Sequence, residues 1–123
     1  MHRDFGRGMR RVLRQLANSA WERELGAELA TLANAFAEWK TGALGPHELS
    51  DRIHAFHQGA ARDLYALYTR VHPPELVARA VALGILREDE LPRDILEALA
   101  AGIHYYRSEA DRPVDAVDAD DSD

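Results

Sequence analysis

The sequence contains no cysteine among its 123 residues. This absence excludes a disulfide scaffold, a thiol nucleophile and any zinc site built from thiolate ligands. No stretch approaches the roughly 18 apolar residues that a membrane span needs, and the first eleven residues lack the apolar centre of a signal peptide. We therefore expect a cytoplasmic protein with no membrane partner.

Motifs of the common catalytic sites are also missing. The sequence has no glycine-rich phosphate loop, no G-x-S-x-G and no H-E-x-x-H. Serine is scarce outside the C-terminal end, and Ser19 is better explained as a helix cap than as a nucleophile. The sequence thus favours a protein without catalytic activity of its own.

Charge is unevenly distributed along the chain, whose net charge is −6. This balance argues against extensive nucleic-acid binding. The first fourteen residues are nevertheless basic, and they leave open a nucleic-acid accessory protein whose binding would be independent of sequence and sensitive to salt. The arginines that would make this contact are Arg7, Arg10, Arg11 and Arg14.

The spacing of apolar residues predicts helices and no strand. The length suits one domain with a single core. Ser19 and Glu22 have the spacing of a capping box, and Pro46 suits the first position of a later helix. That helix should end before "HPP" at 72–74, because a residue that precedes proline is disfavoured in helical conformation. We predict a small all-α bundle with four main helices at about 20–40, 46–71, 74–84 and 92–106.

Two terminal segments are expected to differ from this helical domain, which we place at residues 19–106. Within residues 1–18, an apolar stripe points almost opposite to the stripe that begins at Trp21. This indicates a chain break near Ser19 and a separate short amphipathic helix, which either folds back on the domain or packs on another protein. Residues 107–123 are acidic and lack apolar periodicity, so we expect a disordered tail.

The clearest periodicity lies in residues 46–71, where apolar residues follow a 4-3-4-4-3-4 spacing. Histidines and tyrosines form a second stripe beside this one. They could be hydrogen-bonded residues at the edge of the core, or a contact surface for another protein or a second copy. With the N-terminal amphipathic segment, the residues predicted for such a contact surface are His47, His54, Tyr65, Tyr68, His72, Met9, Leu13 and Leu16.

A third interpretation of the same stripe is a metal or acid–base site. Asp51, His54 and His57 are spaced by three, so neighbouring pairs share a helix face and could ligate one ion, with Glu38 or Glu48 assisting. The pattern resembles one half of a dinuclear site in a helical bundle, which requires further carboxylates and a second such pair. The implied cofactor would be Zn, Fe or Mn.

The histidine–tyrosine stripe and the N-terminal amphipathic segment are two partly apolar surfaces that the predicted core does not require. No complete set of catalytic residues is found, so one hypothesis is preferred. The sequence indicates a small cytoplasmic helical protein that acts as a regulator or adaptor by binding another protein or itself. A metal-binding protein or metal-dependent enzyme centred on His54 and His57 is the first alternative, with no cofactor expected under the preferred hypothesis. The nucleic-acid accessory protein is the second.

Overall fold

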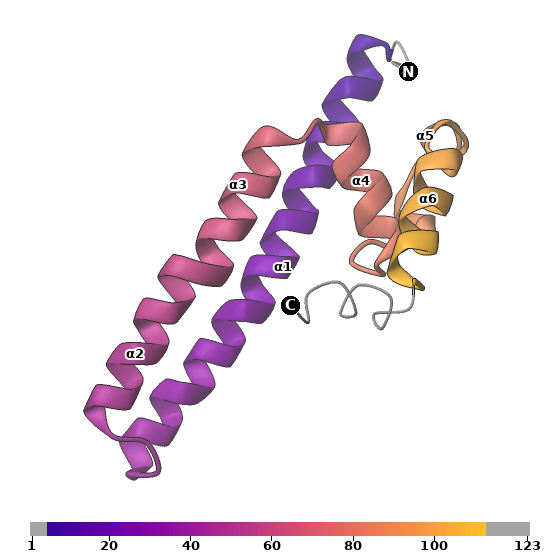
Figure 1. Ribbon diagram of the computed structural model, residues 1–123. Coiled ribbons are helices and arrows are strands. Elements are labelled where there is room, and N and C mark those ends of the chain that lie inside the picture. The colour runs from indigo at the N-terminus through magenta and orange to yellow at the C-terminus, as the bar shows by residue number, and fades with distance from the viewer. Residues whose placement is uncertain (1–4, 113–123) are drawn as a thin grey trace, which may run out of the picture.

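The computed structural model describes residues 5–112, and these residues are helical with no strand, as the sequence predicts. One long helix and a second helical stretch form an antiparallel hairpin, and the remaining helices form a body at one end of it (Figure 1). No helix in the described range is long and apolar enough to cross a membrane. The elements are α1 (Arg7–Thr41), α2 (Pro46–Phe56), the π-helical η1 (His57–Ala61), α3 (Arg62–Arg70), α4 (Pro73–Ala82), the 3₁₀-helical η2 (Glu88–Glu90), α5 (Arg93–Ala98) and α6 (Ala100–Ala110).

Helix α1 is continuous, so the predicted break near Ser19 and the separate N-terminal helix are wrong. The helix begins after Gly6, and Ser19 lies in its interior instead of capping it. Its two opposed apolar stripes coexist because different neighbours contact them. Helix α4 packs on the first stripe, and α2, η1 and α3 contact the second one, part of which stays exposed. The predicted domain boundary between residues 18 and 19 falls inside this helix.

The second arm of the hairpin covers the predicted helix 46–71 but contains a π-helical turn, η1. The cause is visible in the apolar spacing. In a seven-residue repeat, apolar residues are alternately three and four positions apart. Around Ala60 two spacings of four follow each other, so this part of the helix contains one residue more than the repeat. A π turn accommodates one extra residue, so α2 before it and α3 after it both remain in contact with α1.

The tip of the hairpin is closed by glycine and proline chemistry. Gly42 ends α1 with a φ of 87°, a left-handed conformation that glycine adopts without a steric penalty. Pro46 starts α2, and the Glu48 carboxylate accepts a hydrogen bond from the Gly45 N–H at 3.1 Å. A small buried cluster lies inside this tip, composed of Ala35, Leu44 and Leu49.

The body consists of α4 and the segments that follow it. The predicted fourth helix is present as two helices, α5 and α6, with a turn at the buried Leu99 between them. Helix α6 reaches Ala110, so the predicted tail begins later than residue 107; residues 113–123 lie outside the described range. Gly102 of α6 allows a close approach to α4, because a Cβ at this position would lie 3.2 Å from the Ala78 Cβ.

The main core lies where α4 meets both α1 and the later helices. Its buried members come from the first half of α1, from Tyr68 of α3, and from α4, α5, α6 and the segments between them. In the described residues, a second and smaller buried cluster lies at the tip of the hairpin. The most completely buried large side chains are Leu13, Leu76, Val77, Leu86 and Ile95.

Gly84 is expected to be essential for closing the body. Its φ is 80°, which lets Ile85 donate to the Ala80 carbonyl at 2.8 Å and turns Leu86 into the core. The Gly84→Ala substitution forces a Cβ into a left-handed conformation and should lower the free energy of unfolding by about 1 kcal/mol. Chemical denaturation would measure this change. Gly8→Ala, a helical position of α1 with no neighbour within 4 Å, is the control and should leave stability equal or slightly higher; equal effects would contradict the account.

Candidate functional site

The predicted histidine–tyrosine stripe is divided between surface and core. His47, His54 and His72 are exposed, and Tyr65 retains 63% of its accessible surface. Tyr68 is only 8% exposed and belongs to the main core. Within residues 5–112 no histidine side chain forms a hydrogen bond, so Tyr68 alone matches the interpretation of this stripe as a hydrogen-bonded core edge.

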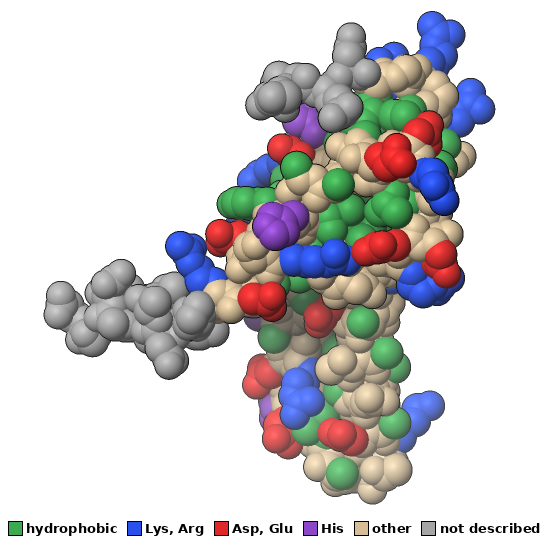
Figure 2. Space-filling model, turned by 90° about the vertical axis from the view of Figure 1, so that its right-hand side faces the viewer, with side chains coloured by type: hydrophobic (Ala, Val, Ile, Leu, Met, Phe, Trp, Pro, Cys, Tyr) green, Lys and Arg blue, Asp and Glu red, His purple; other side chains and the backbone are tan. Residues whose placement is uncertain are grey.

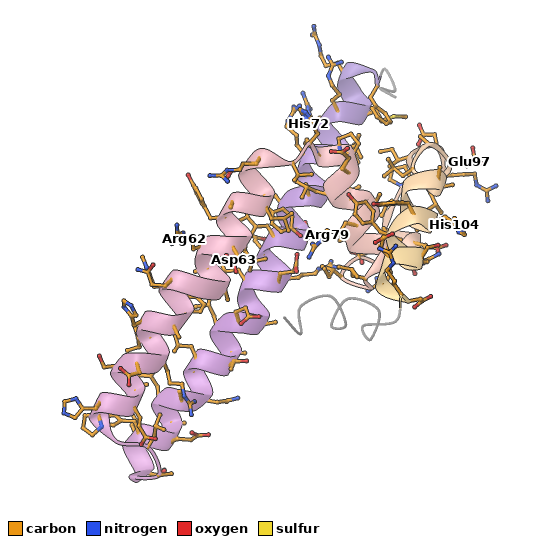
Figure 3. The ribbon with its side chains drawn as sticks, in the orientation of Figure 1. Arg62, Asp63, His72, Arg79, Glu97 and His104 are labelled. Carbon is orange, nitrogen blue, oxygen red and sulfur yellow. The ribbon has the colours of Figure 1, made fainter. Side chains whose placement is uncertain are left out.

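Tyr68 closes a polar cluster between three helices. Its hydroxyl donates to Glu24 of α1, and Arg79 of α4 donates to the same carboxylate at 2.8 and 3.3 Å. The Tyr68 ring also stacks on Trp21 with a centroid separation of 5.6 Å. Arg79 lies at the junction of the hairpin and the body (Figure 3). This cluster therefore ties α1, α3 and α4 together.

The protonation states of this cluster are fixed by its geometry. Burial opposes ionisation of Glu24, but the hydrogen bonds from Arg79 and Tyr68 outweigh it and lower the pKa of Glu24 below its usual range. Burial, then the hydrogen bond to Glu24, raises the pKa of Tyr68 far above its usual value of 10.0. The phenol thus stays a donor and the carboxylate stays an acceptor, which suits a structural tie.

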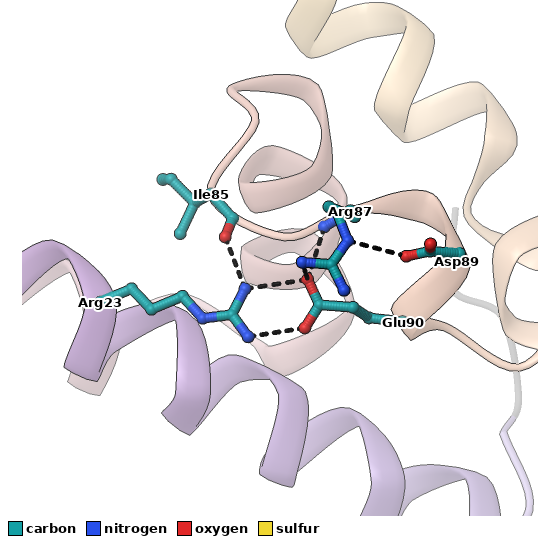
Figure 4. Close-up of polar contacts among 5 residues, drawn as sticks. All are labelled: Arg23, Ile85, Arg87, Asp89 and Glu90. Carbon is teal, nitrogen blue, oxygen red and sulfur yellow. Dashed lines mark hydrogen bonds and ion pairs between the residues drawn. The ribbon is translucent and has the colours of Figure 1, made fainter.

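A second tie joins α1 to the segment that follows α4 (Figure 4). The Arg23 guanidinium donates to both carboxylate oxygens of Glu90, at 2.6 and 2.9 Å, and to the Ile85 carbonyl at 2.8 Å. The Arg87 N–H donates to Glu90 as well, at 2.8 Å. The bonds from Arg23 and then Arg87 lower the pKa of Glu90 to about 2.

The residues predicted to bind metal lie on the solvent side of the second arm. Asp51, His54 and His57 are exposed, and η1 begins at His57. The part of the chain that the structure describes contains no group of three or more His, Asp or Glu side chains placed to hold a metal ion. A site for Zn, Fe or Mn at these residues stays a prediction without a supporting cluster.

The apolar residues near the N-terminus pack in the core and do not form a free surface. Leu13 is only 1% exposed, and Met9 and Leu16 pack against the main core. The predicted contact surface made by these three residues is therefore wrong, because α4 of the same chain covers it. The arginines on the opposite side, Arg7, Arg10, Arg11 and Arg14, are exposed, and Arg10 donates to the Phe5 carbonyl at 2.8 Å.

The hairpin exposes large apolar residues from both of its arms. Leu29, Phe36 and Trp39 of α1 retain 46%, 39% and 41% of their accessible surface, and Ile53 of α2 retains 40%. Figure 1 shows that the end of α1 and the start of α2 extend away from the body, and within residues 5–112 these helices pack mainly on each other there. Two helices cannot surround an apolar stripe, which needs further helices to be buried.

The sequence carries a signal for this face. Residues 29–37, "LATLANAFA", contain no charged side chain. All of them except Leu32 and Ala35 are exposed. A nine-residue helical segment without charge covers all sides of the helix, so the side away from α2 is uncharged as well. Figure 2 shows the hairpin extending below the body, with hydrophobic side chains between charged ones.

Small-molecule binding is not favoured by the shape of the hairpin. The grooves between its arms have volumes of about 220 and 280 Å³. Both are below the roughly 300–1,000 Å³ of typical ligand pockets. The first is lined by Glu28, Thr31, Leu32, Ala35, Arg52, Ala55, Phe56 and Ala60.

No family model, curated protein or solved structure matches this chain.

Loss of Glu24 should destabilise the protein strongly. Glu24→Ala leaves the Arg79 guanidinium and the Tyr68 hydroxyl unpaired in a site where both partners of the ion pair are mostly covered. The free energy of unfolding should fall by about 3 kcal/mol. Glu28→Ala, one helical turn further along α1 and exposed, should change it by less than about 0.5 kcal/mol. Denaturant unfolding compares the two, and equal losses would contradict a structural role for the cluster.

The tie between Arg23 and Glu90 should make stability depend on acid. A pKa lowered to about 2 in the folded chain means that this stabilisation is present above pH 4.5 and is lost as pH falls towards 2. The Glu90→Gln variant should therefore lose less melting temperature than the natural chain between pH 5 and pH 2.5. Glu88→Gln removes an exposed pair with Arg107 and should behave like the natural chain. Parallel acid profiles for all three proteins would refute this role of Glu90.

Proposed function

We propose that this chain is a cytoplasmic helical interaction protein that acts as a regulator or adaptor through the exposed face of its hairpin. One observation carries the proposal: Leu29, Phe36 and Trp39 of α1 and Ile53 of α2 are each about 40% exposed on the hairpin, which extends beyond the body. Several large apolar side chains exposed on one part of a protein are typical of a protein-binding site.

The energetics favour covering this face. Complete burial of a Leu, Ile or Phe side chain contributes about 1.5–3 kcal/mol relative to exposure, and these four residues are close to half exposed. Burying the part of these four side chains that is still exposed would contribute on the order of 4 kcal/mol. The alanine surface between them would add to this value. Association must also offset the loss of rotational and translational freedom, so an extended contact along the hairpin is needed.

The shape of the face favours a helical partner. Large side chains alternate with alanine and glycine along α1, which produces the ridges and grooves into which another helix packs. The hairpin presents only helices along its length, so an added strand would have no sheet edge to pair with. The strongest polar clusters, around Glu24 and Glu90, are occupied by structural ties, which supports a function without catalysis.

A photo-crosslinking residue at position 36 tests this proposal. With p-benzoylphenylalanine in place of Phe36, irradiation in the native host should yield a covalent adduct with a protein, because the side chain lies within a contact surface. The same residue in place of Tyr105, which is 57% exposed on α6, is the matched control and should yield little adduct. No adduct at position 36, or equal adducts at both positions, would overturn the proposal.

A further inference from the structure

We propose that the occupant of this face is a second copy of the chain, packed with its α1 antiparallel to the first α1. The inference rests on the proposed function and names the partner. It would produce a four-helix arrangement from two hairpins, which is the common way for a two-helix hairpin to complete its core. A symmetric dimer uses the same surface on both subunits, so this surface must complement itself.

The outer face of α1 has the composition that self-packing requires. At 100° per residue, one side of the helix carries large residues flanked by small ones. None of these residues is charged, and all are exposed. We call this set the α1 outer face, and it consists of Gly26, Leu29, Ala30, Ala33, Phe36 and Ala37.

Antiparallel pairing about Thr31 matches large residues with small ones. In this register Leu29 faces the partner subunit's Ala33, and Phe36 faces the partner subunit's Gly26. The same register places Leu25 beside the partner subunit's Ala37. Alternation of large and small side chains lets two helices approach closely without voids.

The charges at the two ends of the face agree with the same register. Glu22 and Lys40 are separated by eighteen residues, which is five helical turns, so they lie on one line of α1. Their midpoint is residue 31. Antiparallel pairing therefore brings each Glu22 against the partner subunit's Lys40, whereas parallel pairing would place like charges together. Exposed pairs contribute little affinity, but they select the orientation.

The α1 outer face is long enough for an extended contact between two helices. Residues 22–40 extend over about 28 Å at 1.5 Å per residue. Because this face points away from α2, the contact is one helix wide, about 10 Å, and covers about 280 Å² per subunit. A contact of this size fits a reversible dimer and not a permanent one. The body leaves this face open, because α1 contributes to the main core only as far as Trp21.

Charge reversal provides the sharpest test. Glu22→Lys alone, or Lys40→Glu alone, replaces two attractive pairs with two repulsive ones and should weaken dimerisation about tenfold. The Glu22→Lys/Lys40→Glu double variant should restore it to within about threefold of the natural chain. Sedimentation equilibrium measures each dissociation constant. A double variant as weak as either single variant would overturn the antiparallel register.

Cysteine cross-linking tests the register independently, because the natural chain has no cysteine. Ala33→Cys should be linked into dimers by a short bismaleimide, while Ala101→Cys, exposed on α6, should not. Phe36→Glu should abolish dimerisation with helicity unchanged, whereas Tyr105→Glu should preserve it.

A natural chain that stays monomeric up to several hundred micromolar would overturn the second-copy proposal. A photo-adduct of position 36 with a different protein would then still support the proposed function. The absence of any adduct would contradict both the proposed function and the second-copy proposal.

Discussion

The structure depends on the Glu24 carboxylate, which holds three helices at one point. Tyr68 of α3 and Arg79 of α4 both donate to it, and Glu24 itself belongs to α1. Because the three groups are mostly buried, each would be costly without the others. The cluster fixes where the body attaches to the hairpin. It also divides α1 into a first half that is covered by α4 and a second half that extends beyond the body.

This division gives the hairpin its character as a contact surface. The first half of α1 is buried in the main core, while the second half has only the arm formed by α2, η1 and α3 beside it. Each arm of the hairpin carries an apolar stripe that is wider than the other arm can cover. In a four-helix bundle, two further helices would cover the rest. Exposure of Leu29, Phe36 and Ile53 is the direct consequence. The α1 outer face supplies small residues against which the same large residues of another copy can pack.

Much of the fold follows from sequence, because helix periods and punctuation are local. The spacing in residues 46–71 and the proline at 46 predict a helical stretch that the structure confirms, with a π turn within it. The predicted break in α1 was wrong. Two apolar stripes on opposite sides can belong to two separate helices, or to one helix with a different neighbour on each side. Only the tertiary arrangement distinguishes them. Likewise, tyrosine spacing places Tyr65 and Tyr68 on one side of a helix, but the position of Trp21 and Glu24 decides that Tyr68 alone is buried. The charge-free run 29–37 was visible, yet its exposure depends on what the rest of the chain leaves uncovered.

The molar mass of the natural chain as a function of concentration tests the central claim most directly. Light scattering on eluting protein, from low micromolar to several hundred micromolar, should show a rise towards twice the mass of one chain as the hairpins pair. A constant mass of one chain throughout that range would contradict self-pairing through the hairpin.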